Sequence, residues 1–196
     1  PSAITLYAAP VESNRIFKET VDYFKKDFYG FDYSLLNDLT VNRVYIETIK
    51  QGFLLGKPKR IAFFDFKKPS PVFNSRVRFE INRKGIFHGM AVWFSAHLSQ
   101  KTELSNGPFS KPTHWQQAFL PVREALPVEK GLKIDAHISN QLVHQRMVWN
   151  WQVKAKGREV NYSTLKTAPP QKILTDIHFH KHQPVLLEEG KVHSLI

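Results

Sequence analysis

Leu132-Lys-Ile-Asp-Ala-His-Ile138 decides the fold, because apolar and polar residues alternate through it without interruption. A second stretch, residues 146–154, alternates in a similar way, with Met147, Trp149, Trp151 and Val153 on one side of the pattern. Since successive side chains of a strand point to opposite faces of a sheet, each stretch predicts a strand with one buried and one solvated face. Such strands are typical of antiparallel sheets.

Further strands are predicted on both sides of these two. They cover residues 3–8, 61–66, 72–82, 86–98, 116–123 and 158–165. Glycines that favour turns separate several of them, among them Gly85, Gly131 and Gly157. Eight or so short strands at this spacing predict a mainly β chain that folds as a single antiparallel β-barrel or sandwich domain.

One segment near the N-terminus breaks the β pattern. Phe17, Val21, Phe24 and Phe28 recur at steps of four, three and four, which predicts an amphipathic helix over residues 14–28 with Ser13 or Asn14 as its N-cap. The helix leads into residues 29–39, which are apolar and aromatic without strand alternation. This insertion packs back on its own sheet or is covered by a second subunit, and the pattern alone leaves both possibilities open.

The composition excludes several classes of protein. The 196 residues contain no cysteine, which excludes disulfides and thiolate metal sites, and no apolar run is long enough to span a membrane. The net charge is +11, and residues 50–84 hold ten lysines and arginines against two acidic residues. A nucleic-acid site is possible there, but a solvated strand face with basic loops is the favoured interpretation. The absence of cysteines and of an export signal suggests the cytoplasm or nucleus.

A bent loop is the best candidate for a functional site. The segment Leu104-Ser-Asn-Gly-Pro-Phe-Ser-Lys-Pro-Thr-His-Trp-Gln-Gln117 contains two prolines and a glycine between strand-like runs. Proline lacks the N–H donor of a sheet ladder, so the segment must leave the sheet and return near Gln116. Its His-Trp pair therefore lies on a loop held at both ends, where binding and catalytic residues are often found.

Several segments, in this order, resemble the C-terminal β-barrel half of protein arginine methyltransferases. They are Thr5-Leu-Tyr-Ala8, Tyr29-Gly-Phe-Asp32, His88-Gly-Met-Ala-Val-Trp-Phe94, Leu104-Ser-Asn-Gly-Pro108, Thr113-His-Trp115 and Val128-Glu-Lys-Gly131. The resemblance covers about residues 1–165, which implies one domain there and a C-terminal tail of unknown role over residues 166–196. Residues 13–45 correspond to the family's helical dimerisation arm.

This resemblance implies methyl transfer from S-adenosylmethionine to the guanidinium group of arginine in protein substrates. His114 and Trp115 match the family's Thr-His-Trp loop and are the expected catalytic residues, as one wall of the arginine pocket, with Thr113 supporting the loop. A guanidinium must be oriented by carboxylates, and a nucleotide cofactor needs a glycine-rich turn. The chain has neither near this loop, since Glu188-Glu189 is its only adjacent acidic pair and no G-x-G-x-x-G occurs. The cofactor would be bound by an upstream domain, and these 196 residues alone would be inactive.

The resemblance also implies a homodimer of the full-length protein, in which the arm docks on the cofactor domain of a second subunit. The candidate contacts follow the family's pattern. They are Tyr29, Gly30, Phe31, Asp32, Leu35, Leu36 and Leu39. Because that mode of assembly needs the cofactor domain, we expect the isolated chain to be monomeric or weakly associated.

Three features depart from the family. Asn106 replaces a small hydroxyl residue, which we expect to change only the local turn, since asparagine tolerates positive φ. The basic segment 50–84 would repel arginine-rich substrates and is expected to face away from them. The tail contains His178, His180 and His182, for which a polar edge strand is favoured over a metal site. The alternative to the enzyme is a non-catalytic basic barrel that acts as a scaffold or a nucleic-acid or partner-binding module.

Overall fold

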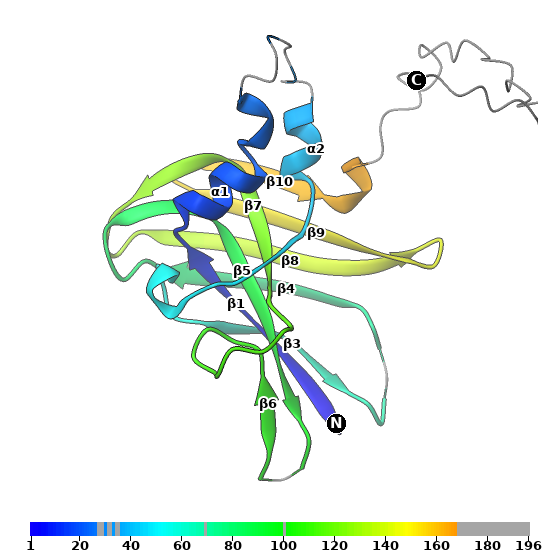
Figure 1. Cartoon of the computed structure of the whole chain (residues 1–196). Helices are drawn as coiled ribbons and strands as arrows, with labels where there is room; N and C mark the ends of the chain where they lie inside the picture. The colour runs from blue at the N-terminus through cyan, green and yellow to red at the C-terminus, as the bar shows by residue number, and fades with distance from the viewer. Residues whose placement is uncertain (27–29, 31–32, 34–35, 69, 100, 168–196) are drawn as a thin grey trace, which may run out of the picture.

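The strands of the protein form two antiparallel sheets (Figure 1). The structure is a computed structural model and describes residues 1–26, 30, 33, 36–68, 70–99 and 101–167. The first sheet has the order β2 (Tyr45–Glu47), β7 (Gln117–Val128), β5 (Gly85–His97), β1 (Ala3–Val11) and β3 (Lys59–Asp65), with β6 (Glu103–Ser105) also paired to β5. The second sheet has the order β10 (Arg158–Ser163), β9 (Arg146–Ala155), β8 (Lys133–Val143) and β4 (Phe73–Glu80).

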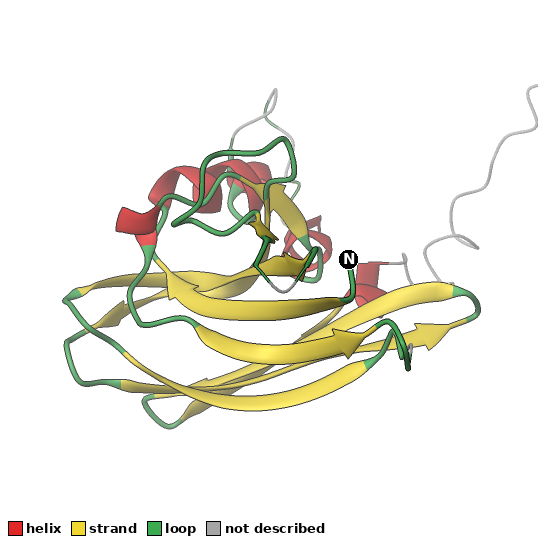
Figure 2. Ribbon diagram, turned by 90° about the horizontal axis from the view of Figure 1, so that it is seen from below, coloured by secondary structure: helices red, strands yellow, loops and turns green. Residues whose placement is uncertain are grey.

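The prediction of a mainly β, antiparallel chain is confirmed, but the described strands do not close into a barrel. β10 and β4 are the edges of the four-stranded sheet, and β2 and β3 end the main order of the six-stranded sheet, in which β6 pairs with β5 alone. Figure 2 shows the sheets as two layers, with the helices beyond one of them. The sheets therefore stack as a sandwich and leave strand edges unpaired.

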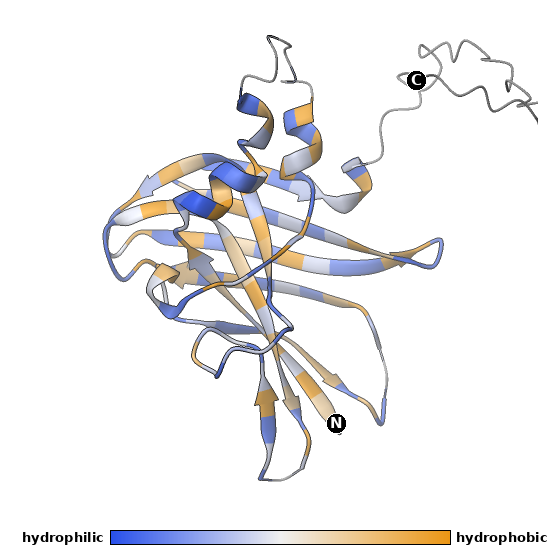
Figure 3. Ribbon diagram, viewed as in Figure 1, coloured by the Kyte–Doolittle hydropathy of each residue, from blue (hydrophilic) through white to orange (hydrophobic). Residues whose placement is uncertain are grey.

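The main core lies between the two sheets. Its largest fully buried side chains include Trp151, Phe79, Phe87, Leu120 and Ile138. Trp151 also donates from Nε1 to the carbonyl oxygen of Pro121 across the sheets, at 2.7 Å. Hydrophobic and hydrophilic residues alternate along many of the strands (Figure 3), as the period of two predicted for residues 132–138 and 146–154 requires.

A second apolar cluster covers the opposite face of the six-stranded sheet. On β5, Met90 and Val92 belong to the main core, whereas Ala91 and Trp93 point into the second cluster. Ile16 from the first helix packs there as well. The central strands of this sheet are therefore buried on both faces.

The first helix is shorter than the predicted 14–28. α1 covers Asn14–Thr20 behind the expected N-cap Ser13, whose hydroxyl accepts from the Ile16 N–H at 3.4 Å. The hydroxyl of Thr20 donates back to the Ile16 carbonyl oxygen at 2.7 Å, and a separate turn, η1 (Tyr23–Lys25), follows. The short helices α2 (Asn37–Val41), η3 (Gln51–Phe53) and η4 (Thr164–Thr167) complete the described elements. None of the helices in these ranges is both long and apolar enough to cross a membrane.

Candidate functional site

The loop between β6 and β7 leaves the sheet after Ser105 and returns at Gln117. Its two functional candidates lie side by side, with the ring centroids of His114 and Trp115 4.7 Å apart and the ring planes 42° apart. Trp115 is 47% exposed, and its ring meets the edge of Phe94 on β5 at a centroid distance of 6.0 Å. The structure therefore presents an imidazole and an indole together at the surface.

Asn106 fixes this loop to the sheet. Its side chain is only 6% exposed, and its Oδ1 accepts from the Phe94 N–H at 2.9 Å. Its Nδ2 donates to the carbonyl oxygens of Trp115 at 3.0 Å and Gln116 at 2.5 Å. One buried amide thus joins strand β5 to the backbone that carries the His-Trp pair.

Asn106 does not have the role that we expected of it, which was that of a turn residue with positive φ. Positive φ occurs at only three non-glycine residues of the described chain, and Asn106 is not among them. The hydrogen bonds of its side chain, and not its backbone conformation, explain why an asparagine occupies this position. A serine or threonine at this position has one hydroxyl group and cannot make all three of these bonds at once.

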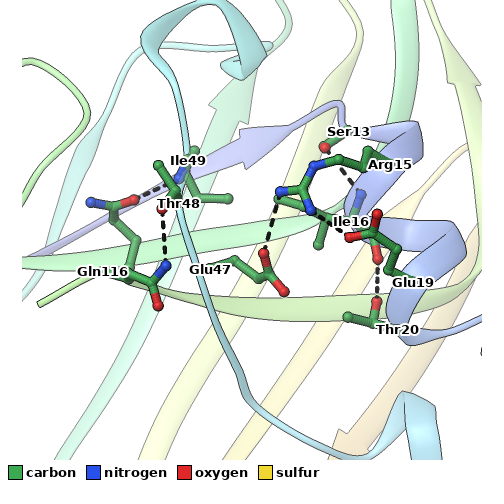
Figure 4. A network of polar contacts seen from close by, with 10 residues as sticks. Ser13, Arg15, Ile16, Glu19, Thr20, Glu47, Thr48, Ile49 and Gln116 are labelled. Carbon is green, nitrogen blue, oxygen red and sulfur yellow. Dashed lines mark hydrogen bonds and ion pairs between the residues drawn. The ribbon is translucent and has the colours of Figure 1, made fainter. Parts of the chain in front are cut away.

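Two glutamines tie the return of the loop to the segment after β2. Gln117 is buried, accepts from the Ile49 N–H at 2.6 Å, and donates to the carbonyl oxygen of Asn106. The neighbouring Gln116 donates from Nε2 to the Thr48 hydroxyl at 3.0 Å (Figure 4). In the same view Arg15 on α1 lies between Glu19 and Glu47, so helix and loop are both linked to residues 47–49.

The first part of the loop packs closely on Trp93. A Cβ atom at Gly107 would lie 2.6 Å from Nε1 of Trp93, so only glycine fits there without a shift. The Ser105 hydroxyl donates to the Phe94 carbonyl oxygen at 3.0 Å and accepts from the Gly107 N–H at 3.1 Å. Thr113 makes the expected hydroxyl-to-backbone bond, donating to the carbonyl oxygen of Trp115 at 3.2 Å.

A second polar cluster, which the sequence did not reveal, lies where β1 meets α1. His88 is buried, and its Nδ1 accepts from the Ser13 N–H at 3.2 Å, so the ring is neutral there and its pKa is lowered by burial. Burial opposes ionisation of Glu12, but Arg83 and the Ile86 N–H bond to its carboxylate, and the net effect lowers the pKa of Glu12. These bonds hold the start of α1 against the sheet.

The predicted arm is described only in part. Tyr29, Phe31, Asp32 and Leu35 lie outside the described residues, as do His178, His180 and His182 of the tail. Gly30 adopts a φ of +77°, and Leu36 and Leu39 are half-buried at and within α2. The hydroxyl of Thr40 on α2 donates to the Val21 carbonyl oxygen at 3.1 Å, which joins the two ends of the insertion.

The basic segment 50–84 is partly neutralised by ion pairs. Arg78 contacts Asp135 with two bonds of 2.5 and 3.1 Å, and this guanidinium lowers the pKa of that carboxyl. Arg83 pairs with Glu12, and Lys84 lies 3.3 Å from Glu129. Within the described ranges, no three histidines or acids converge as metal ligands would.

The geometry defines a class of protein: a two-sheet antiparallel β domain that carries an aromatic loop clamped by buried amides. Comparisons with known families identify the particular family within this class. The model of the arginine methyltransferase oligomerization subdomain matches residues 2–156, so the chain belongs to that family.

Individual proteins of this family also match the chain. Protein arginine N-methyltransferase 2 from Homo sapiens is 26% identical over 164 residues, covering 76% of this chain and 37% of that protein. The corresponding protein from Xenopus tropicalis is 27% identical over 182 residues, covering 83% of this chain and 42% of that protein. The chain thus spans about two fifths of the length of these relatives.

A solved structure shows the same fold. The Trypanosoma brucei PRMT1 enzyme-prozyme heterotetrameric complex with AdoHcy superposes with a TM-score of 0.74 at 16% identity, over 83% of this chain and 56% of that chain. At this level of identity the likeness concerns the fold.

Proposed function

We propose that this domain is the substrate-side half of a protein arginine N-methyltransferase, which transfers a methyl group from S-adenosylmethionine to the guanidinium group of a protein arginine. The observation that carries the proposal is the exposed His114–Trp115 pair on a loop fixed at both ends, in a domain of this family. Relatives that match the chain are named as enzymes of this activity.

The described residues do not fit the cofactor itself. No pair of carboxylates lies on the loop, and no described strand leads through a glycine-rich turn into a helix, as nucleotide binding requires. We therefore assign S-adenosylmethionine and the orienting carboxylates to a part of the protein outside these 196 residues. By themselves the 196 residues would not transfer a methyl group.

The role of the loop is to receive and orient the substrate arginine. The exposed face of Trp115 offers a cation–π contact to a guanidinium, which contributes about 0.5–2 kcal/mol. His114, beside it, can hydrogen-bond an acidic group of a neighbouring domain. Holding the guanidinium in one orientation lowers the entropic part of the barrier to methyl transfer.

Substitution of Trp115 in the complete protein tests this role. Trp115→Ala should lower kcat/KM for an arginine peptide by about 2- to 30-fold, the equivalent of the cation–π contact. His114→Ala should lower it as well. Phe109→Ala is the matched control, because Phe109 is another exposed aromatic of the same loop, at 57% exposure. A rate equal to that of the control, with an unchanged Tm, would remove Trp115 from the site.

We also propose that the insertion over residues 13–45 is a dimerisation arm. The matched family is described as an oligomerization subdomain, and the trypanosomal relative is part of a heterotetrameric complex. The contacts would include Leu36 and Leu39, the described apolar residues of the candidate set. Since the arm would dock on a cofactor domain, the isolated chain should sediment as a monomer or a weak dimer; a tight dimer would contradict this mode of assembly.

The binding-module alternative is less well supported. Three of the ten cations in residues 50–84 form ion pairs within the described part of the chain, which weakens the field available to a nucleic acid. Salt-dependent retention of the protein on RNA or DNA would favour this alternative over the enzyme.

A further inference from the structure

An apolar groove opens between the two sheets, where β7 and β10 face each other without pairing. Its volume is about 840 Å³. The apolar side chains that line it come from both sheets and from the insertion before β2: Phe87, Val122, Leu126, Val153, Val160 and Tyr162, together with Leu36 and Leu39 of the proposed arm. A groove of this size and character is large enough to take several apolar side chains.

One wall of the groove is the free edge of β10. β9 and β10 are joined by Lys156 and Gly157, both with positive φ, in a two-residue hairpin that makes Ala155 and Arg158 a hydrogen-bonded pair. The alternation of the ladder then turns the backbone groups of Glu159, Asn161 and Ser163 away from β9.

A hydrogen bond on that edge confirms that these backbone groups point away from β9. The Ser163 N–H donates to Oδ1 of Asn42, on the side away from β9, at 3.0 Å. The N–H and C=O groups of Glu159 and Asn161 point the same way and bond to no other described residue. β10 thus offers a short free edge beside an apolar groove, the arrangement to which extended segments add as strands.

The charges at the rim favour an occupant without a strong net charge. Arg123 pairs with Asp38, and Arg158 lies 3.5 Å from Glu124. These four groups pair with one another, and Lys166 leaves the lining with a single net positive charge, which is too small to select an arginine-rich or a strongly acidic peptide. An apolar strand with a polar outer face suits it better.

The chain itself contains such a segment. Beyond η4, whose Lys166 lines the groove, the sequence continues through Ala168-Pro-Pro-Gln171 into Lys172-Ile-Leu-Thr-Asp-Ile-His-Phe-His180. In the latter stretch Ile173, Thr175, Ile177 and Phe179 occupy one side of a period of two, and Asp176, His178 and His180 the other, where Leu174 is the one apolar exception. Four linker residues span up to about 14 Å, enough to turn the chain back toward β10.

We propose that residues 172–180 add to the free edge of β10 as an antiparallel strand and place Ile173, Ile177 and Phe179 in the groove. The short tether gives the segment an effective concentration on the order of millimolar, so a weak intrinsic affinity is sufficient. The added strand would pair Glu159 and Asn161 and bury the groove. This role is independent of the proposed catalysis, because the loop with Trp115 is not part of the groove.

Disulfide trapping tests the proposal directly, because the chain contains no cysteine of its own. Val160→Cys is combined in turn with Ile173→Cys, Ile177→Cys or Phe179→Cys, and the control pairs Val160→Cys with Leu187→Cys farther along the tail. Since a disulfide needs Cβ atoms about 4 Å apart, we expect at least one of the three pairs to close more than tenfold faster than the control. Equal rates would overturn the proposal, as would exclusively intermolecular disulfides, which would assign the groove to a second copy.

Amide hydrogen exchange of the unmodified edge provides an independent measurement. In the full chain, Ile177→Asp combined with Phe179→Asp should speed exchange at Glu159 and Asn161 by at least tenfold, while the Val160 amide, bonded to β9, changes little. Leu186→Asp combined with Leu187→Asp is the matched control and should leave all three amides unchanged. Fast exchange at Glu159 and Asn161 in the parent chain would contradict the added strand.

Discussion

Replacing Asn106 tests whether one buried amide holds the His-Trp loop. Asn106→Ala removes the acceptor for the Phe94 N–H and the donor to the carbonyl oxygens of Trp115 and Gln116. A hydrogen bond of this kind contributes about 1 kcal/mol net, so three of them predict a loss of about 3 kcal/mol in the free energy of unfolding. Because Asn106 is 6% exposed, water cannot readily replace the missing bonds.

Asn106→Asp is the matched variant. It keeps the shape and the acceptor for Phe94, but at neutral pH its carboxylate faces two carbonyl oxygens in place of an amide that donates to both. We expect it to cost at least as much as alanine at pH 7 and to recover in part at lower pH, where a protonated carboxyl donates again.

Urea unfolding of the parent chain and both variants, followed by tryptophan fluorescence and far-UV circular dichroism, measures the losses. Surface substitutions usually change the free energy of unfolding by no more than about 0.5 kcal/mol. Variants that differ from the parent by no more than this amount would refute the reasoning that Asn106 holds the loop.

Two further predictions concern the sheet and its polar support. Gly89→Ala should lower the free energy of unfolding by more than about 3 kcal/mol, because its φ is +155° and a Cβ would lie 2.4 Å from the Leu120 carbonyl oxygen. Gly52→Ala is the control in Tm measurements. It should change the Tm little, because a Cβ at Gly52 meets nothing within 4 Å. Burial holds the pKa of His88 below its ordinary value of 6.5, so the unfolded chain takes up the proton first and stability should fall as the pH drops below about 6.5. His88→Gln should flatten this decline in urea midpoints measured from pH 7.5 to 5.5, and an unchanged slope would contradict the assignment.

The long strands could be predicted because a period of two persists over many residues. β8 and β9 appear where residues 132–138 and 146–154 alternate, although β8 extends to Val143. β2 and β6 were missed, because three residues are too few to show a period. The helix was predicted too long, since the apolar spacing through Phe24 continues past Thr20, where the α-helix ends.

The closure of the sheets could not be predicted, because strand number does not determine which edges pair. An open edge at β10 and a closed barrel have the same alternation in the sequence. The candidate loop was recognised from its prolines, glycine and His-Trp pair, but its support was not. Asn106 and Gln117 read as turn and strand-end residues, and only the tertiary structure shows that their amides are buried and bonded across the loop.

The domain's central role is tested most directly by locating a substrate arginine in the complete protein. A crystal structure with an arginine peptide and S-adenosylhomocysteine gives the distance between the guanidinium carbon and the centroid of the Trp115 ring. We predict a distance within about 6 Å, with the guanidinium over the exposed face of the ring. A guanidinium bound elsewhere, with Trp115 and His114 both out of contact with it, would contradict the assignment of this loop to the arginine pocket.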